Sequence, residues 1–252
     1  MSVTGLCQLC GTAGPLVDSH VVPQSFWKGV TSGKSPGQIL SNTPGEFPRR
    51  SPTGVYGQFV CGPCEASFGQ YDDYAKTCLL DGVTHAKTLY RAGTKVALEF
   101  PSFDYRKLKL FFLVTLWRAH CASDAFYKKV SLGPYANPIR ALITAGDAGT
   151  PDDFSVVLAT FDPDKDPLNL RHAPMDPHPE RFDGIRVYRL YLAGYVAYIK
   201  VDRGLLPATL RAFQLDPGQP LRVVMRDPQK EFAVMSDIAK ETERTKKRHS
   251  KE

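Results

Sequence analysis

The segments CQLC (residues 7–10) and CGPC (residues 61–64) decide the fold of this chain, because each places two cysteines around one tight turn. Such a turn directs two thiolates toward one point, and the glycine and proline of the second segment favour turns. Two turns supply four sulfur ligands, the set that a closed tetrahedral Zn²⁺ site requires. We therefore predict one structural zinc site, with free dithiols or a disulfide as the alternative. Its expected ligands are Cys7, Cys10, Cys61 and Cys64.

The composition of the 252 residues is that of an ordinary globular protein, with 42% hydrophobic and 23% charged residues. The longest strongly apolar run, residues 110–117, is far shorter than the roughly 20 residues of a membrane helix, so we expect no membrane partner. The first residues do not resemble an export signal, so we expect a cytoplasmic protein whose reduced cysteines can bind metal. The net charge of +6 permits a polyanionic partner without requiring one.

Residues 1–80 are predicted to form one small domain around the two cysteine turns. Residues 16–17 and 55–60 have the composition of short strands, and the second runs directly into the CGPC turn. A helix is expected after that turn, over residues 65–80. Residues 31–54 are rich in Ser, Gly, Pro and Thr and predict a long irregular loop, a kind of segment that is usually functional or mobile.

Residues 81–252 are predicted to form a second domain, in which helices accompany an antiparallel sheet, so that the whole chain is α+β. Asp104 is a suitable N-cap for a helix that runs to Cys121 and is apolar on nearly every side, as a central buried helix would be. Another helix should start near Pro138 and end before Gly146. Strands are predicted over residues 154–161, 185–201 (two strands) and 221–226, with a loop over residues 162–184.

The two cysteine turns, the segment SHVVP (residues 19–23) and Glu65 directly after the last cysteine resemble the HNH (ββα-metal, treble-clef) endonuclease family. They are most similar to a divergent branch in which a Ser-His-x-x-Pro signature replaces the usual Asp-His. The resemblance covers residues 1–75. It implies an N-terminal treble-clef zinc finger and a hydrolase that cleaves phosphodiester bonds of a nucleic acid, with DNA as the expected substrate.

The resemblance implies that His20 is the general base, because a neutral imidazole near pH 7 suits proton abstraction from water. Glu65 stands where the family usually has His or Asn and is the implied ligand of a catalytic Mg²⁺ or Mn²⁺, a role that carboxylate oxygen suits. Alternate side chains of a strand share a face, so Asp18 can approach the same cation while Ser19 cannot. Structural roles are the alternatives: His20 can order the finger through a backbone hydrogen bond, and Glu65 can complement the positive end of its helix.

The chain departs from the family pattern at two positions. Ser19 replaces the metal-binding Asp that usually precedes the histidine. Tyr56 stands where the family usually has an Asn that orients the histidine. His20 therefore needs a different partner to fix the orientation of its ring.

Other charged residues near the finger are better explained as surface groups. Asp72 and Asp73 are interpreted as charges on the helix face, because the axial rise puts residue 72 about 10 Å from Glu65, too far to share one ion. The basic residues around the loop are candidates for phosphate contacts, although solvation explains each of them singly. These are Lys28, Lys34, Arg49 and Arg50, and the basic tail of residues 240–252 is likewise interpreted as a solvated end.

Three functions are compatible with these features. The first is a metal-dependent HNH-type endonuclease with a C-terminal domain for recognition. The second is a non-catalytic zinc-finger module that binds nucleic acid or a protein partner. The third is a zinc staple in a protein whose function lies in residues 81–252. A metal-dependent cleavage assay separates the first function from the other two.

Overall fold

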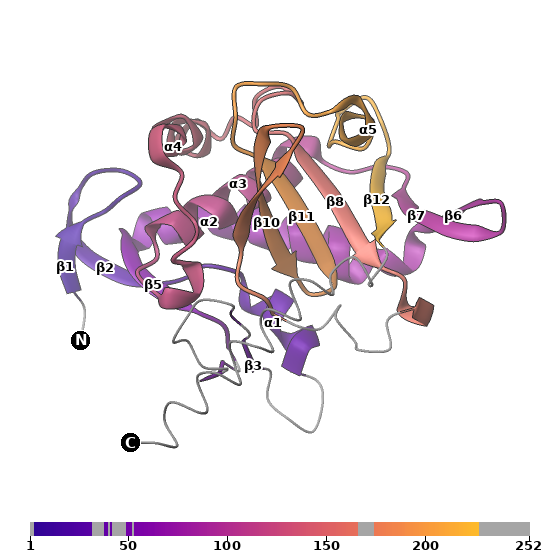
Figure 1. Cartoon of the computed structure of the whole chain (residues 1–252). Helices are drawn as coiled ribbons and strands as arrows, with labels where there is room; N and C mark the ends of the chain where they lie inside the picture. Colours follow the sequence, from indigo (N-terminus) through magenta and orange to yellow (C-terminus); the bar gives the residue numbers. More distant parts are fainter. Residues whose placement is uncertain are drawn as a thin grey trace, which may run out of the picture.

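The computed structural model describes residues 3–31, 38–39, 41, 49–51, 53–165 and 174–226. These residues form an α+β structure with a three-stranded, a seven-stranded and a two-stranded sheet. Figure 1 shows the three-stranded sheet on the left and the seven-stranded sheet on the right, with helices between them. The predicted α+β class is confirmed.

The three-stranded sheet consists of β1 (Val3–Leu6), β2 (Ala13–His20) and β5 (Tyr56–Cys61) in the order β1-β2-β5, with antiparallel pairing. The first cysteine turn connects β1 to β2, and β5 ends at the first cysteine of the second pair. Because Leu16 pairs with Cys61, both cysteine turns lie at the same end of the β2–β5 pair. His20 pairs with Tyr56 at the other end.

Helix α2 (Gly62–Ala75) begins where β5 ends, so the second cysteine turn is the first turn of this helix. Pro63 stands in that turn, where its missing N–H removes no helical hydrogen bond. The helix therefore starts before the predicted Glu65. It continues through a π-helical segment, η1 (Lys76–Asp81), into a 3₁₀ turn, η2 (Gly82–His85).

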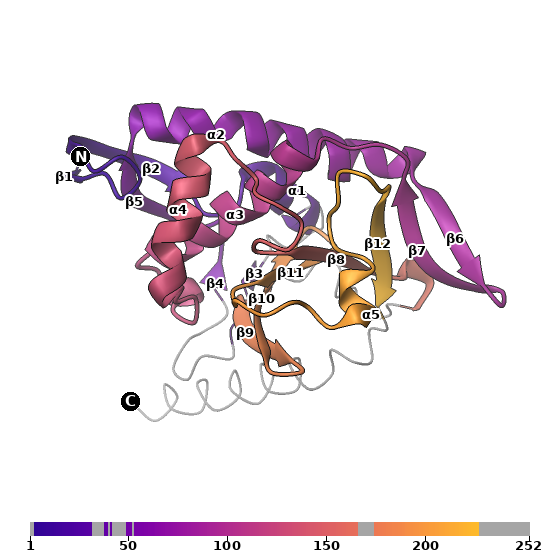
Figure 2. The ribbon, with the colours of Figure 1, turned by 90° about the horizontal axis from the view of Figure 1, so that it is seen from above.

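Helix α3 (Tyr105–Cys121) has the bounds that the sequence predicts. The Asp104 carboxylate accepts a hydrogen bond from the Lys107 backbone N–H at 2.9 Å and caps the helix. Residues 108–119 are all buried, so α3 is the central helix that the apolar pattern indicates. Figure 2 shows α2 running along the top of the view, with α3 below it.

Two smaller helices flank α3. Helix α4 (Ala136–Ala145) packs against α3 and ends at Gly146, whose φ of 62° is the left-handed cap that the glycine predicts. Helix α1 (Gln24–Thr31) is absent from the sequence-based prediction. It packs on the core through Phe26, whose ring lies 5.2 Å from that of Phe111.

The larger sheet has seven strands: β6 (Lys87–Arg91), β7 (Thr94–Phe100), β8 (Val156–Phe161), β9 (His178–Phe182), β10 (Ile185–Leu192), β11 (Tyr195–Lys200) and β12 (Leu221–Arg226). Their order is β6-β7-β12-β8-β11-β10-β9. The β12–β8 pair is parallel, and the other neighbouring pairs are antiparallel. The two strands predicted within residues 185–201 turn at Ala193, whose φ is 46°.

The structure corrects two predicted loops and adds a hairpin. The loop expected over residues 162–184 contains β9, which pairs with β10 at the sheet edge. The loop expected over residues 31–54 contains the pair β3 (Gln38–Ile39) and β4 (Arg49–Arg50). The hairpin β6–β7 is also absent from the prediction. The remaining short elements are Ala125–Tyr127, Gly133–Tyr135, Pro163–Lys165 and α5 (Ala208–Arg211).

Aromatic side chains join the small sheet and α2 to α3. The ring of Trp117 on α3 lies 6.2 Å from Phe59 of β5 and 6.4 Å from Phe68 of α2, and all three belong to one buried cluster. Helix α3 therefore supports the three-stranded sheet and α2, while the division into domains 1–80 and 81–252 stays a prediction. Among the described helices, none is long and apolar enough to cross a membrane.

Candidate metal centre and the adjacent histidine site

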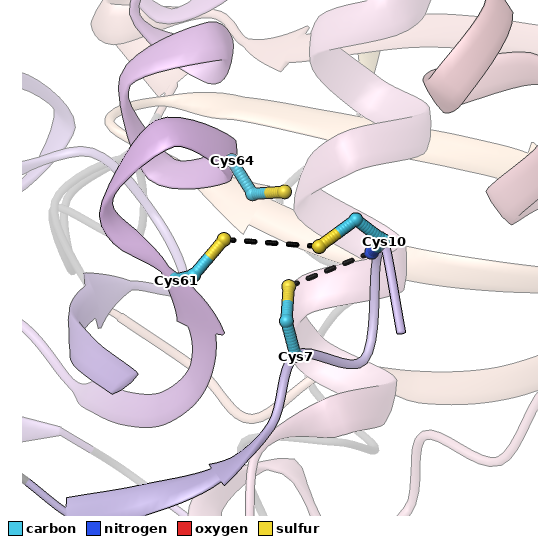
Figure 3. Close-up of side chains that lie close together, drawn as sticks. All are labelled: Cys7, Cys10, Cys61 and Cys64. Carbon is cyan, nitrogen blue, oxygen red and sulfur yellow. Dashed lines mark hydrogen bonds between the residues drawn. The ribbon is translucent and has the colours of Figure 1, made fainter. Parts of the chain in front are cut away.

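The four predicted cysteine ligands lie together at one end of the β2–β5 pair, and Figure 3 shows their sulfurs directed toward a common point. All four Sγ atoms lie within 4.8 Å of one another, and the Sγ atoms of Cys10 and Cys61 are 3.8 Å apart. An ion that binds four sulfurs tetrahedrally at about 2.3 Å holds them roughly 3.8 Å apart. The cluster is therefore a possible metal site whose ligand type and spacing are compatible with structural zinc.

The thiols of this cluster differ in their surroundings. Hydrogen bonds with Thr12 lower the pKa of Cys10 to about 6, whereas burial raises the pKa of Cys64. Metal ligation requires all four groups as thiolates, so binding of a cation releases protons, including that of the partly buried Cys64. A cation bound by these sulfurs would have a closed shell and would act as a structural link between the first turn and α2.

Among the described residues, no other group of three or more His, Cys, Asp or Glu side chains is clustered closely enough to hold a metal. The predicted set of Asp18, His20 and Glu65 is therefore not a preformed three-ligand site. Mg²⁺ usually keeps several waters and binds through one or two carboxylates plus substrate phosphates. A pair of protein ligands is sufficient for such an ion.

His20 is the last residue of β2 and is half-buried. Burial lowers the pKa of His20, and a hydrogen bond with the Thr53 backbone partly opposes this effect. Its Nε2 atom is buried and has no hydrogen-bond partner in the described part of the chain. The lowered pKa favours the neutral imidazole, in which one ring nitrogen can accept a proton.

Tyr56 is the residue of β5 that lies beside His20. It pairs with His20 across the β2–β5 ladder, and the two ring centroids are 4.0 Å apart at an interplanar angle of 45°. The His20 ring is thus held by an aromatic contact and by the Thr53 backbone, without an amide side chain.

Glu65 lies in the first turn of α2, directly after the last cysteine. Its negative charge is close enough to His20 to raise the pKa of the imidazole against the larger effect of burial. Its Oε2 atom is buried and has no hydrogen-bond partner among the described residues. The charge of Glu65 therefore acts on His20, and each side chain has one buried polar atom without a hydrogen-bond partner among the described residues.

Arg118 of α3 is the residue of this site that the sequence-based prediction missed. Its side chain is 0% exposed, and its guanidinium group hydrogen bonds with both carboxylate oxygens of Asp72 at 2.9–3.3 Å. Its NH2 atom lies 3.9 Å from Glu65 Oε1. An arginine directly after the apolar run of residues 110–117 was the available signal, because a buried arginine requires an acidic partner.

Asp18 and Ser19 occupy opposite environments on β2. Asp18 is exposed, and its Oδ1 accepts a hydrogen bond from the Gln58 amide at 2.8 Å. Ser19 is buried, and its Oγ has no partner within the described residues. Asp18 is therefore a surface carboxylate, without the burial that distinguishes Glu65.

Two of the predicted surface groups lie on α2. Asp73 is exposed, as predicted, whereas Asp72 is paired with Arg118.

The other predicted surface groups lie outside what the structure describes. Nothing is assigned to the side chains of the loop and tail groups. These are Lys28, Lys34, Arg49, Arg50 and residues 240–252.

No protein-family model matches the chain, and neither a curated protein nor a solved structure is significantly similar to it. The class of the protein has to be argued from the two sites at the ends of the β2–β5 pair.

Proposed function

We propose that the chain is a metal-dependent endonuclease of the HNH type, in which a treble-clef finger with a structural Zn²⁺ carries the active site. The observation that carries the proposal is the pair of His20 and Glu65. These side chains come from β2 and α2, which both begin next to the cysteine cluster. Each side chain has one buried polar atom without a hydrogen-bond partner among the described residues. Buried polar atoms normally have partners, so this pair suits a ligand that completes them.

His20 acts as the general base in this mechanism. Its lowered pKa keeps the imidazole neutral at pH 7, and Nε2 is free to accept the proton of a water molecule. The Thr53 backbone and the ring of Tyr56 limit rotation of the imidazole. Together these contacts do the work that the family's Asn does.

Glu65 would hold the catalytic cation. Asp18, on the exposed face of β2, would attract the cation without binding it as closely as Glu65. Carboxylate oxygen is the ligand that Mg²⁺ and Mn²⁺ prefer. When bound, such a cation neutralises the negative charge that develops on a phosphate and its leaving oxygen. The cysteine site cannot do this, since four sulfur ligands close its coordination shell.

The proposed substrate is a nucleic acid, with DNA as the first candidate, in a cytoplasmic setting. The net charge of +6 is compatible with a polyanion. Phosphate contacts by basic residues would position such a substrate without reading its sequence.

The test is cleavage of plasmid DNA, single-stranded DNA and RNA by the full chain in Mg²⁺ and in Mn²⁺. We expect His20→Ala to lower turnover by about 10²–10⁴-fold, the usual cost of losing a general base, with zinc content and folding unchanged. His85→Ala is the matched control, because His85 is exposed in η2. Glu65→Ala should weaken the response to added Mg²⁺, and Glu65→His should restore part of it.

Two results contradict the proposal. One is that no substrate is cut in either metal, and the other is that His20→Ala cuts as fast as the wild type. If the protein then retains nucleic acid in a binding assay, the finger is a non-catalytic binding module.

A further inference from the structure

Arg118 brings a positive charge from α3 into the site formed by β2 and α2. Its side chain is 0% exposed, although a buried charge is costly unless it is paired. No other described residue links α3 to this face of α2 through an ion pair. The placement of Arg118 therefore needs an explanation that includes its partners.

The partners of Arg118 all lie on one face of α2. Glu65, Phe68 and Asp72 are spaced three and four residues apart, which places them in line along the helix. The guanidinium group lies 4.4 Å from the centroid of the Phe68 ring and between the two carboxylates. One side chain of α3 thus contacts the same stretch of α2 that begins with the proposed cation ligand.

The two carboxylates share Arg118 unequally. Asp72 accepts three hydrogen bonds from the guanidinium group, at 2.9, 3.0 and 3.3 Å. The contact with Glu65 is 3.9 Å, which is too long for a hydrogen bond. Glu65 is therefore attracted by the guanidinium charge while its oxygens remain free to bind something else.

We propose that Arg118 is a positioning residue for Glu65, and that its pairing with Asp72 keeps Glu65 available to the catalytic cation. This inference rests on the proposed function. Asp72 neutralises Arg118, so the guanidinium group orients Glu65 without forming a closed ion pair with it. If residue 72 no longer carries a negative charge, Arg118 turns to Glu65, the remaining carboxylate beside it, and competes with the cation.

The test is Mn²⁺ binding to the zinc-loaded full chain, measured by calorimetry and by the electron paramagnetic resonance signal of free Mn²⁺. We expect Asp72→Asn to weaken binding about tenfold, the change that roughly 1.4 kcal/mol produces. Removing the competitor in the double variant Asp72→Asn/Arg118→Met should recover only part of the lost affinity, because the guanidinium group then neither competes for Glu65 nor orients it. A recovery of this kind shows that the effects of Asp72 and Arg118 on Mn²⁺ affinity are coupled. A loss of stability alone does not produce such a recovery.

Asp73→Asn is the matched control, because Asp73 is the neighbouring carboxylate on α2 and is exposed. It should leave Mn²⁺ affinity unchanged. The inference is overturned if folded, zinc-loaded Asp72→Asn binds Mn²⁺ as the wild type does, or if the double variant binds no better than Asp72→Asn.

Failure of the inference and failure of the proposed function are distinguishable. Equal Mn²⁺ affinities in variants that cut nucleic acid overturn the role of Arg118 and leave the nuclease intact. The predicted affinity pattern without cleavage of any substrate supports Arg118 as the positioning residue of a cation site and overturns the nuclease. Absence of Mn²⁺ binding by the wild type overturns both.

Discussion

The two ends of the β2–β5 pair carry sites of different construction. At the end where Leu16 pairs with Cys61, four like ligands come from two local turns and meet within 4.8 Å. At the end where His20 pairs with Tyr56, unlike groups come from three elements, and the fixed arginine is supplied by α3. The first site is complete in itself, whereas the second depends on how the helices pack.

This difference predicts that the two ends respond differently to substitution. A tetrahedral sulfur site is no longer closed when one of its cysteines is replaced by a residue that cannot bind the metal. At the histidine end, Tyr56 contacts the imidazole and Arg118 comes from α3. An assembled site can replace one orienting contact by another, and a closed site cannot.

The largest effect that we expect is at the cysteine end. Cys61→Ser should abolish zinc binding and disorder the three-stranded sheet, because zinc supplies on the order of 10 kcal/mol in small fingers. Elemental analysis gives the zinc content, and hydrogen exchange of β1, β2 and β5 reports the folding. Cys78→Ser is the control, because Cys78 lies in η1 outside the cluster. Wild-type protein with clearly less than one zinc per chain, and no disulfide, would contradict the assignment.

What could be predicted from the sequence follows the same division. The cysteine site and the ends of α3 and α4 were predictable, because their signals are local: paired cysteines, the Asp104 cap and the Gly146 left-handed cap. The hairpin β6–β7 also has a local signal, since its turn contains Ala92-Gly93, and that signal was missed.

The contacts of Arg118 could not be predicted in this way. Arg118 and Asp72 lie on different helices, and their contact depends on the packing of α2 against α3. The sequence shows only an arginine after an apolar run, and a buried arginine requires a partner that the sequence does not identify. Glu65 is a similar case, because a first-turn acid is explained by the helix dipole until Arg118 and His20 are placed beside it.

A smaller effect should appear at the histidine end, as a dependence of the free energy of unfolding on pH. Burial raises the pKa of Asp72 to about 6, even though Arg118 favours its ionised form. The folded chain therefore binds a proton at Asp72 more readily than the unfolded chain does. The stability that this protonation contributes is lost as the pH rises through 6. Between pH 7 and pH 4, the wild type should gain about 1–3 kcal/mol of unfolding free energy relative to Asp72→Asn.

Urea unfolding of both proteins at several pH values measures this difference. Protonation of the cysteines affects both proteins equally and cancels in the comparison. Asp73→Asn serves as the exposed control and should follow the wild type. A wild type that instead loses stability relative to Asp72→Asn on acidification would show that the charge of Arg118 outweighs burial.

The smallest effect should come from Asp18, and it decides where the cation lies. Asp18 is exposed and hydrogen bonds with Gln58, so Asp18→Asn should change the free energy of unfolding by less than about 0.5 kcal/mol. Because Asp18 would attract the cation without binding it as closely as Glu65, Asp18→Asn should weaken Mn²⁺ binding by less than about threefold, well below the tenfold that 1.4 kcal/mol represents. Gln58→Ala, which removes the same hydrogen bond without removing a carboxylate, separates the charge from the contact. If Asp18→Asn weakens Mn²⁺ binding as much as Glu65→Ala does, the cation lies on the exposed face of β2. The histidine end would then be a strand-surface site, and the guanidinium group of α3 would have no part in placing its metal.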